Sequence, residues 1–391
     1  MADDHGHAHA TRPADPTPHA VRRLVRAAVV AIGAVTLVGL VLLWPSGDRR
    51  GFADELGLSG ERIPATVTAV TLAPCSDSPD FDCVRIDVRF DDGRPPGSFE
   101  LTVGGANPDI SEGDDVLLFD DGRGGYTFAD FQRGTPLALL VILFVAAVLV
   151  LGRLRGVGAL AGLVGSIGVL TVFLLPAINE GSSPLAVSLV AASVVAFIAL
   201  YMAHGVSTRT SVALLGTLAS LLITGVVALV FVAAANLTGL ADETVLALQA
   251  TVGGFDVRGL LLAGIVIGSL GVLDDVTVTQ VSAVWELRAA NPAGSARDLY
   301  AAAVRIGRDH ISSTVNTLVL AYAGASLPLL LLFTQAGRSI GDIATSEIVA
   351  VEIIRALVGS LGLIASVPIT TALAVAATTP LAHSSSPDDH Q

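Results

Sequence analysis

The sequence predicts a polytopic α-helical membrane protein with about eight transmembrane helices and a small extracytoplasmic β-rich domain between the first two. Three observations support this fold class. Of the 391 residues, 52% are hydrophobic and only 15% are charged, whereas a soluble globular protein carries about 25% charged residues. The apolar residues gather into runs of about 17–25 residues, the length that crosses a bilayer. One long segment instead alternates apolar and polar residues, which is typical of β-strands.

The chain before the first apolar run is polar and proline-rich, so residues 1–20 are predicted to form a disordered cytoplasmic tail. The first run, residues 24–44, follows three closely spaced arginines. Its apolar core is longer than the roughly 7–15 residues of a signal peptide, and no A-x-A cleavage site follows it. We therefore expect an uncleaved transmembrane anchor.

Residues 45–134 form the predicted β domain. Short turn-forming stretches such as Asp-Asp-Gly separate five alternating segments, which indicates a small antiparallel barrel or sandwich, OB-like in the first case. Cys75 and Cys83 flank the turn between the first two strands, and in an oxidising compartment they are expected to form a disulfide. The five expected strands are 65–72, 84–90, 98–103, 115–119 and 126–131.

Residues 135–379 form the predicted seven-helix transmembrane domain, and residues 380–391 a cytoplasmic tail. The arginines test this count of spans. If the spans alternate, most arginines fall on one side of the membrane, and the opposite short loop 177–183 has none. The positive-inside rule then predicts a multi-pass protein of the cell (plasma) membrane with both termini in the cytoplasm. The seven expected spans are 135–152, 156–176, 184–203, 211–235, 259–284, 311–334 and 356–379.

Two adjacent acids, Asp274 and Asp275, interrupt the run 259–284. If the span ended at Leu273, it would measure only about 22 Å of helix, too short for a hydrocarbon core of about 30 Å. We therefore expect the span to continue to Val284, with both acids within the bilayer. An acid at that depth costs about 2.5–3.5 kcal/mol on insertion scales, so it should face protein or a wet cavity. Such a pair suits a carrier of protons or cations.

Polar residues continue from these acids at helical spacing. Asp275, Thr279, Ser282 and Glu286 fall on one stripe, and a counterpart with Asn316 follows in the next span. The two stripes predict a hydrated path between neighbouring helices; the alternative is ordinary hydrogen bonding between helices. The residues predicted for the ion, proton or substrate path are Asp274, Asp275, Thr279, Ser282 and Asn316, and those for a cytoplasmic gate or headgroup anchor are Glu286, Arg305, Arg308 and Asp309.

The stretch from Val252 to Leu330 resembles the YibE/F-like family of bacterial membrane proteins. Two segments show the resemblance, GFDVRGLLLAGIVIGSLGVLDDVTVTQVSAVWEL and RIGRDHISSTVNTLVLAYAGASLPLLLL. In that family a glycine-rich span leads into an aspartate, often preceded by methionine where this chain has Leu273, so Asp274 is the expected equivalent and Asp275 is an addition. The resemblance implies an integral membrane protein of a family whose activity is largely undetermined and whose members are sometimes presumed to be transporters. The residues matching the second segment are Gly307, Arg308, Asp309, Asn316, Thr317, Leu318, Leu320, Ala321 and Tyr322.

These features predict a membrane transporter or channel for an unidentified small solute or ion, proton-coupled through the aspartates. The alternative is a non-catalytic envelope scaffold or receptor that acts through the β domain. An intramembrane aspartic enzyme is disfavoured because adjacent acids on one helix do not converge on a substrate, and the sequence contains no P-loop, H-E-x-x-H or G-x-S-x-G motif. We therefore expect no enzyme activity.

Composition limits the partners and cofactors. All 22 basic residues are arginines, so no lysine is present to carry protons, and two cysteines are too few for a cysteine-rich metal site. We expect no cofactor, no metal and no nucleic-acid partner. The expected partners are the lipid bilayer and the unidentified solute or ion, while an envelope partner of the β domain and a homo-oligomer remain open.

Overall fold

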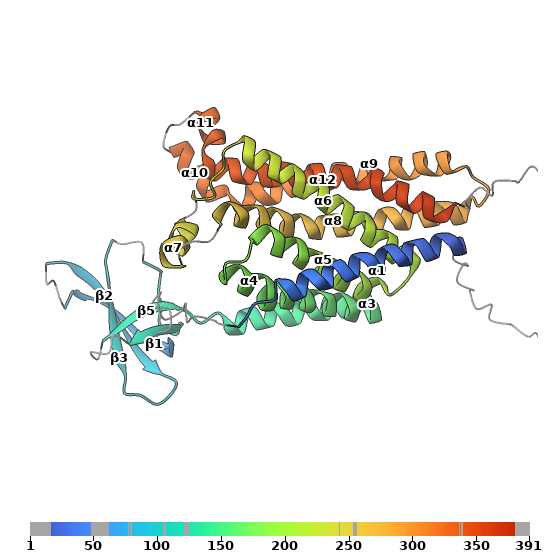
Figure 1. Ribbon diagram of the computed structural model, residues 1–391. Coiled ribbons are helices and arrows are strands. Elements are labelled where there is room, and N and C mark those ends of the chain that lie inside the picture. Colours follow the sequence, from blue (N-terminus) through green and yellow to red (C-terminus); the bar gives the residue numbers. More distant parts are fainter. Residues whose placement is uncertain are drawn as a thin grey trace, which may run out of the picture. The chain divides into compact units, whose positions relative to one another are not determined.

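The computed structural model describes residues 17–47, 62–76, 78, 80–104, 107–120, 125–241, 243–252, 256–335, 337 and 339–379. The chain divides into two compact units (Figure 1). The helical unit comprises Met1–Arg49 and Gly152–Gln391, and the β unit comprises Arg50–Leu151. The predicted C-terminal tail, and the predicted N-terminal tail up to residue 16, lie outside the described residues.

The β unit contains all five predicted strands, each within a few residues of its expected bounds. They form one antiparallel sheet in the order β3-β2-β1-β4-β5. The predicted alternation is visible in their burial, because every second side chain of β1 and β2 near the sheet centre points into the core. The strands are β1 Arg62–Pro74, β2 Asp82–Phe90, β3 Gly97–Thr102, β4 Asp115–Asp120 and β5 Tyr126–Phe131.

This sheet curls toward closure. The long strand β1 pairs with β4 along its first half and with β2 along most of its length, and a register shift between Val67 and Ala69 bends it. The two edge strands, β3 and β5, approach each other, and the rings of Phe99 and Phe128 stack with centroids 6.2 Å apart. A single curled five-stranded sheet of this order corresponds to the OB-like alternative and not to a two-sheet sandwich.

The predicted disulfide between Cys75 and Cys83 is present and closes the turn between β1 and β2. The carboxylate of Glu100 on β3 accepts hydrogen bonds from the backbone N–H and the hydroxyl of Ser76, at 2.9 and 2.6 Å. These two bonds hold the pKa of Glu100 below its usual value. The disulfide loop is therefore attached to β3 as well as to its own two strands.

The helical unit confirms the polytopic membrane fold. Six helical segments of the described chain are long and apolar enough to cross a membrane. The pair α9 and α10, bent by 60°, makes a seventh if the two helices form one span. The elements that carry them, and the short helices between them, are α1 His19–Leu42, α3 Gly134–Val169, the π-helix η1 Leu170–Leu174, α4 Leu175–Asn179, α5 Pro184–His204, α6 Thr208–Ala234, α7 Glu243–Val252, α8 Val257–Ala290, α9 Ala296–Ala325, α10 Leu327–Gln335, α11 Ile340–Thr345 and α12 Glu347–Thr378.

One of the six segments is long enough for two crossings. Residues 134–179 make up 46 residues, about 69 Å of helix, which is more than twice a hydrocarbon core of about 30 Å. The backbone leaves the helical region at Arg153 (φ 52°, ψ −130°), inside the turn predicted between the second and third spans. The parts of the segment on either side of Arg153 correspond to the two predicted spans 135–152 and 156–176.

Three helices form the centre of the helical unit. α6, α8 and α12 pack against one another, α5 packs on α8, and α9 packs mainly on α12. Small residues permit this close approach: Gly216 lies against Thr370, and Gly362 lies against Thr224. The beginning of α1 and the end of α12 lie at one end of the unit (Figure 1), which we call the termini end; the other is the far end.

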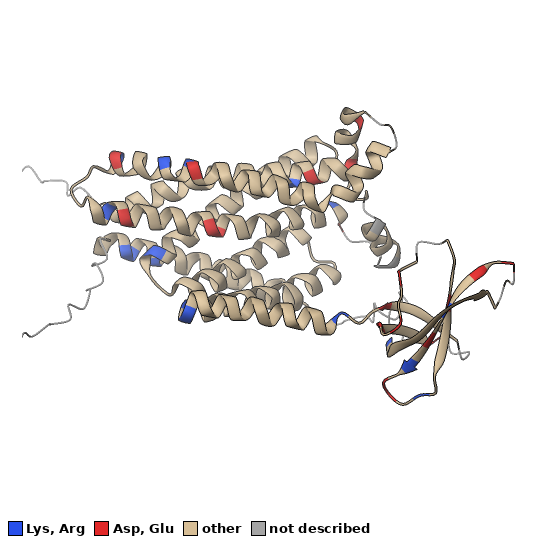
Figure 2. Ribbon diagram, turned by 180° about the vertical axis from the view of Figure 1, so that it is seen from behind, with Lys and Arg blue, Asp and Glu red and all other residues tan. Residues whose placement is uncertain are grey.

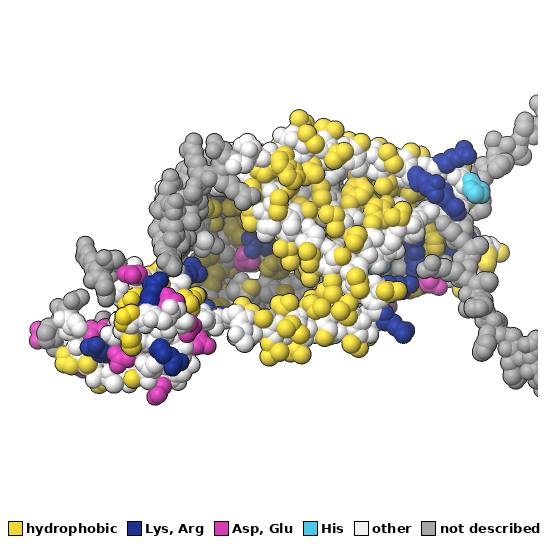
Figure 3. All heavy atoms as spheres, turned by 90° about the horizontal axis from the view of Figure 1, so that it is seen from below, with side chains coloured by type: hydrophobic (Ala, Val, Ile, Leu, Met, Phe, Trp, Pro, Cys, Tyr) yellow, Lys and Arg dark blue, Asp and Glu magenta, His cyan; other side chains and the backbone are white. Residues whose placement is uncertain are grey.

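Hydrophobic side chains cover most of the face of the helical unit that Figure 3 shows, and basic side chains gather at the termini end. Large apolar residues such as Leu222 and Leu357 are more than half exposed. A surface of this kind is stable against lipid and would be exceptional in water. The chain is therefore a multi-pass membrane protein in contact with the bilayer.

Candidate functional site

The helix α8 holds both acids, Asp274 and Asp275, near its middle. Its N-terminus is capped by Asp256, whose carboxylate accepts a hydrogen bond from the N–H of Gly259 at 2.8 Å. The helix runs unbroken to Ala290 and is the most deeply buried of the candidate spans. It does not end at Leu273, so the acids are not at a helix terminus. Figure 2 shows charged residues part way along the helices as well as at their ends.

Asp274 faces the packed interior. Its side chain is half-buried, and its Oδ1 atom is buried without a hydrogen-bond partner. The neighbours Leu273, Val276 and Thr277 are fully buried. The hydroxyl of Thr277 donates to the backbone carbonyl of Asp274 at 3.0 Å and does not reach the carboxylate. A buried carboxylate oxygen with no donor is costly, and a proton or a bound cation removes that cost.

Asp275 lies 100° further round the helix and is exposed. It belongs to an open side of α8, which we call the α8 stripe. The stripe begins with glycines, and a Cβ added at Gly264 or Gly271 would meet nothing within 4 Å. The α8 stripe consists of Gly264, Gly268, Gly271, Asp275, Thr279, Ser282 and Glu286, all exposed except the half-buried Ser282.

The second predicted stripe, on α9, also lies on an open side. The residues of α9 that pack on α8 and α12 include Ile311, Val315 and Leu318, and Gly307 lies against Gln280 and Val367. The opposite face is exposed. This α9 stripe consists of Arg305, Arg308, Asp309, Ser312 and Asn316.

The two predicted stripes therefore do not meet within one chain. Asn316 points away from the packed face of α9 and is not brought against Thr279 or Ser282. The predicted gate is not assembled in one chain either. The carboxylate of Glu286 pairs with Arg209 of α6 at 3.5 Å, and among the described residues Arg305, Arg308 and Asp309 form no ion pair.

Sequence reasoning missed a row of buried polar side chains between α6, α8 and α12. The hydroxyls of Thr217 and Thr277, both fully buried, hydrogen-bond each other over 2.6 Å. The amide of Gln280 donates to the carbonyl of Ala303 at 2.8 Å and to the hydroxyl of Thr371 at 2.7 Å. The signal was available, because Thr217, Ser220 and Thr224 recur at helical spacing in an apolar run. The row includes Thr217, Ser220, Thr224, Ser269, Thr277, Gln280, Ser360, Ser366, Thr370 and Thr371.

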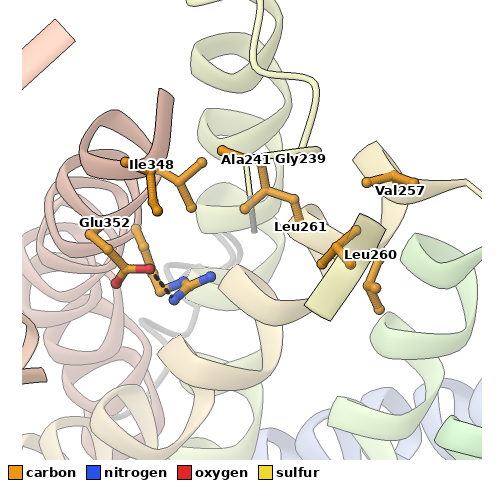
Figure 4. A pocket seen from close by; sticks show the side chains of 10 residues that line it. Gly239, Ala241, Val257, Leu260, Leu261, Ile348 and Glu352 are labelled. Carbon is orange, nitrogen blue, oxygen red and sulfur yellow. Dashed lines mark hydrogen bonds and ion pairs between the residues drawn. The ribbon is translucent and has the colours of Figure 1, made fainter. Parts of the chain in front are cut away.

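A cavity of about 190 Å³ opens at the far end of the helical unit (Figure 4). Apolar side chains from α8 and α12, including Leu260, Leu261 and Ile348, form most of its wall. Its charged groups are Glu352 and Arg355 of α12, which pair at 2.7 Å across one helical turn. The cavity can admit a small solute, and the ion pair gives it two polar contacts of opposite sign.

No group of three or more His, Cys, Asp or Glu side chains comes together anywhere in the described chain. The oxygen atoms near Asp274 are the carboxylates of two adjacent residues and neutral hydroxyls. Oxygen atoms of this kind bind protons and coordinate hard cations. The nitrogen and sulfur ligands that are typical of zinc or copper sites are not among these groups.

Comparison with known proteins gives one match. The family model described as YibE/F-like protein matches residues 140–380, which begin within α3 and extend past the end of α12. No match was found among curated proteins or solved structures.

Proposed function

Because the chain belongs to the YibE/F-like family of membrane proteins, whose model covers well over half of it, we propose that it is a carrier or channel for a small solute or ion and that Asp274 exchanges a proton or cation during transport. The proposal contains no catalytic step. It places the protein in the cell membrane, with the termini end and its arginines in the cytoplasm, as the positive-inside rule favours.

The observation that supports this most strongly is the buried, unpaired Oδ1 of Asp274. Ionisable residues within membrane-spanning helices are rare because they are expensive, and they are typical of ion pathways and proton relays. A structural carboxylate at this depth would be expected to have a donor for each buried oxygen. Asp274 has no such donor for Oδ1 among the described residues, so a transported or exchanged cation supplies the missing partner in our proposal.

The rest of the route is built from residues at two depths. The cavity with Glu352 and Arg355 receives a solute at the far end, and the hydroxyl pair Thr217–Thr277 lies beside Asp274 in the centre. Asp275 lies on the open side of the same helix turn. In this arrangement the acids have different roles: Asp274 binds within the packed core, and Asp275 contributes to the polar side of α8.

Flux measurements test the proposal. The purified chain and its Asp274→Asn and Asp275→Asn variants are reconstituted into liposomes, and proton, sodium and potassium fluxes are recorded under an imposed gradient. We expect the flux through the Asp274→Asn variant to be at least tenfold lower than that through the parent, because an amide cannot exchange a proton or balance the charge of a cation. Asp298→Asn, in the first turn of α9, is the control and should leave the flux unchanged. Equal fluxes in the parent and in both aspartate variants would refute the role of this site.

The alternative function, an envelope scaffold or receptor, is favoured by the β unit. That unit has its own core and its own disulfide, which a domain needs if it binds a partner outside the bilayer. Deletion of residues 50–130 distinguishes the two functions. Under the scaffold hypothesis, this deletion abolishes the activity of the protein and Asp274→Asn leaves that activity intact. Under the carrier hypothesis, Asp274→Asn alone is sufficient to abolish transport.

A further inference from the structure

The α8 stripe and the α9 stripe leave charged side chains exposed part way along their helices. Asp275 lies 15 residues before the end of α8 at Ala290, about 22 Å along the helix. Arg308 lies 12 residues after the start of α9 at Ala296, about 18 Å along it. Both side chains are exposed in a single chain. A charge facing lipid at the centre of a helix costs about 2.5–3.5 kcal/mol, so each stripe needs a cover.

Charge and shape indicate which surface packs on the two stripes. The α8 stripe carries Asp275 and also Glu286, which is already paired with Arg209 of the same chain. The α9 stripe carries two bases, Arg305 and Arg308, and one acid, Asp309, so the two stripes have opposite net charge. The glycines at 264 and 271 leave room for a helix to approach α8 closely. An apolar partner or a lipid tail would leave the charges uncompensated, whereas the α9 stripe offers opposite charge to the α8 stripe.

The contacts within one chain set the depth of the two stripes. Gln280 donates to the carbonyl of Ala303 and lies against Gly307, and Gly268 lies near the hydroxyl of Tyr322. Interpolation between these contacts places Asp275 level with about residue 312, one helical turn from Arg308. A two-fold axis along the bilayer normal preserves depth, so it carries the arginine of one copy to the level of the aspartate of the other.

We propose that two copies of this chain form a dimer in which the α9 stripe of each covers the α8 stripe of the other, with Asp275 facing Arg308 of the partner subunit. The same contact forms twice in such an isologous dimer. The hydroxyl and carboxylate groups that one chain leaves on two separate faces then line a common polar seam, to which each copy contributes. The interface does not require transport, so it is tested independently of the flux of Asp274 variants.

Disulfide trapping tests the contact in the full chain. The variant Thr279→Cys/Arg305→Cys places thiols on both stripes at similar depth, because the contact of Gln280 with Ala303 and Gly307 puts Thr279 level with about residue 306. The two native cysteines are already paired with each other. In nanodiscs treated with a mild oxidant, we expect most of the variant to migrate as a dimer on a non-reducing gel. The matched control Val226→Cys/Leu361→Cys, on side chains of α6 and α12 that are 53% and 47% exposed, should remain at least tenfold less cross-linked. Equal cross-linking of the two variants would overturn the proposal.

Charge reversal supplies a second readout that misfolding does not imitate. Asp275→Arg and Arg308→Asp should each lower the dimer fraction at least tenfold in dilute detergent, measured by light scattering. The double variant restores the opposite charges in a swapped order, so its dimer fraction should return to within about threefold of the parent. A monomeric parent would show that lipid or water covers the stripes, and a double variant no better than the single ones would show that these two residues do not meet. Either result overturns the proposal.

Discussion

Two neighbouring residues acquire opposite environments because a helix turns by 100° per residue. Asp274 is turned toward the packed interior of the helical unit, while Asp275 lies on the open α8 stripe. Their chemistry is identical, so the difference comes entirely from the helices that surround α8. A doublet of acids therefore need not act as a pair, and the two proposals above accordingly give Asp274 a cation or proton and Asp275 a second surface.

At the same scale, Gln280 joins three helices through one side chain. Its amide, on α8, bonds the carbonyl of Ala303 on α9 and the hydroxyl of Thr371 on α12. Gln280→Leu removes both bonds and leaves the carbonyl without this donor, so we expect the free energy of unfolding to fall by about 1–2 kcal/mol. Reversible unfolding in mixed micelles measures the difference.

The control for this variant is Thr317→Val on the exposed face of α9, where the hydroxyl bonds only the carbonyl of Ser313 in its own helix. Its unfolding free energy should stay within about 0.5 kcal/mol of the parent. If Gln280→Leu is as stable as Thr317→Val, the amide does not hold the three helices together.

At the scale of elements, the packing of α6 on α12 depends on glycine. A Cβ added at Gly362 would collide with the side chain of Thr224, so Gly362→Ala must push the two helices apart. We expect a loss of about 1–3 kcal/mol in unfolding free energy. Gly168→Ala in α3 is the matched control, because a Cβ there meets nothing within 4 Å.

This control should be neutral or slightly stabilising, since alanine favours a helix by about 0.8–1.0 kcal/mol over glycine. Thermal unfolding of both variants in the same detergent gives the comparison. If Gly362→Ala unfolds at the same temperature as Gly168→Ala, then α6 and α12 adapt to the extra carbon without loss of stability.

Helices and strands were predictable where the apolar residues of the sequence follow a regular period or form a long run. Alternation located all five strands, and apolar run length located helices that are long enough to cross a membrane, with a break at Arg153 inside the turn predicted there. The predicted span 311–334 is not a single straight helix, because α9 and α10 meet within it at a bend of 60°. The polar start of α9 was missed, because a helix that begins at Ala296 among charged residues has no apolar run to mark it. The prediction that the two stripes face each other within one chain was wrong. The face of α9 that packs on α8 and α12 is set by side chains such as Val315 and Leu318, and the spacing of the polar residues alone does not reveal it.

At the scale of the whole molecule, the two units should differ in their response to loss of the disulfide. Cys75→Ser/Cys83→Ser opens a short loop in the β unit, and we expect that unit to lose about 2–3 kcal/mol of stability. The helical unit has separate cores and should be unaffected. Hydrogen exchange of the full chain resolves both in one experiment, with faster exchange expected on β1 and β2 and no change on α6, α8 and α12. Unchanged exchange on both strands would contradict the expectation.

The break at Arg153 has a consequence for how the gene can be divided. The boundary between the two compact units falls at Leu151 and Gly152, next to this break. Residues 134–151 therefore belong to the β unit. Two separately translated fragments that part here would each retain membrane-embedded helices of their own. Neither half would be released into solution, and reassembly would have to take place within the two dimensions of the bilayer.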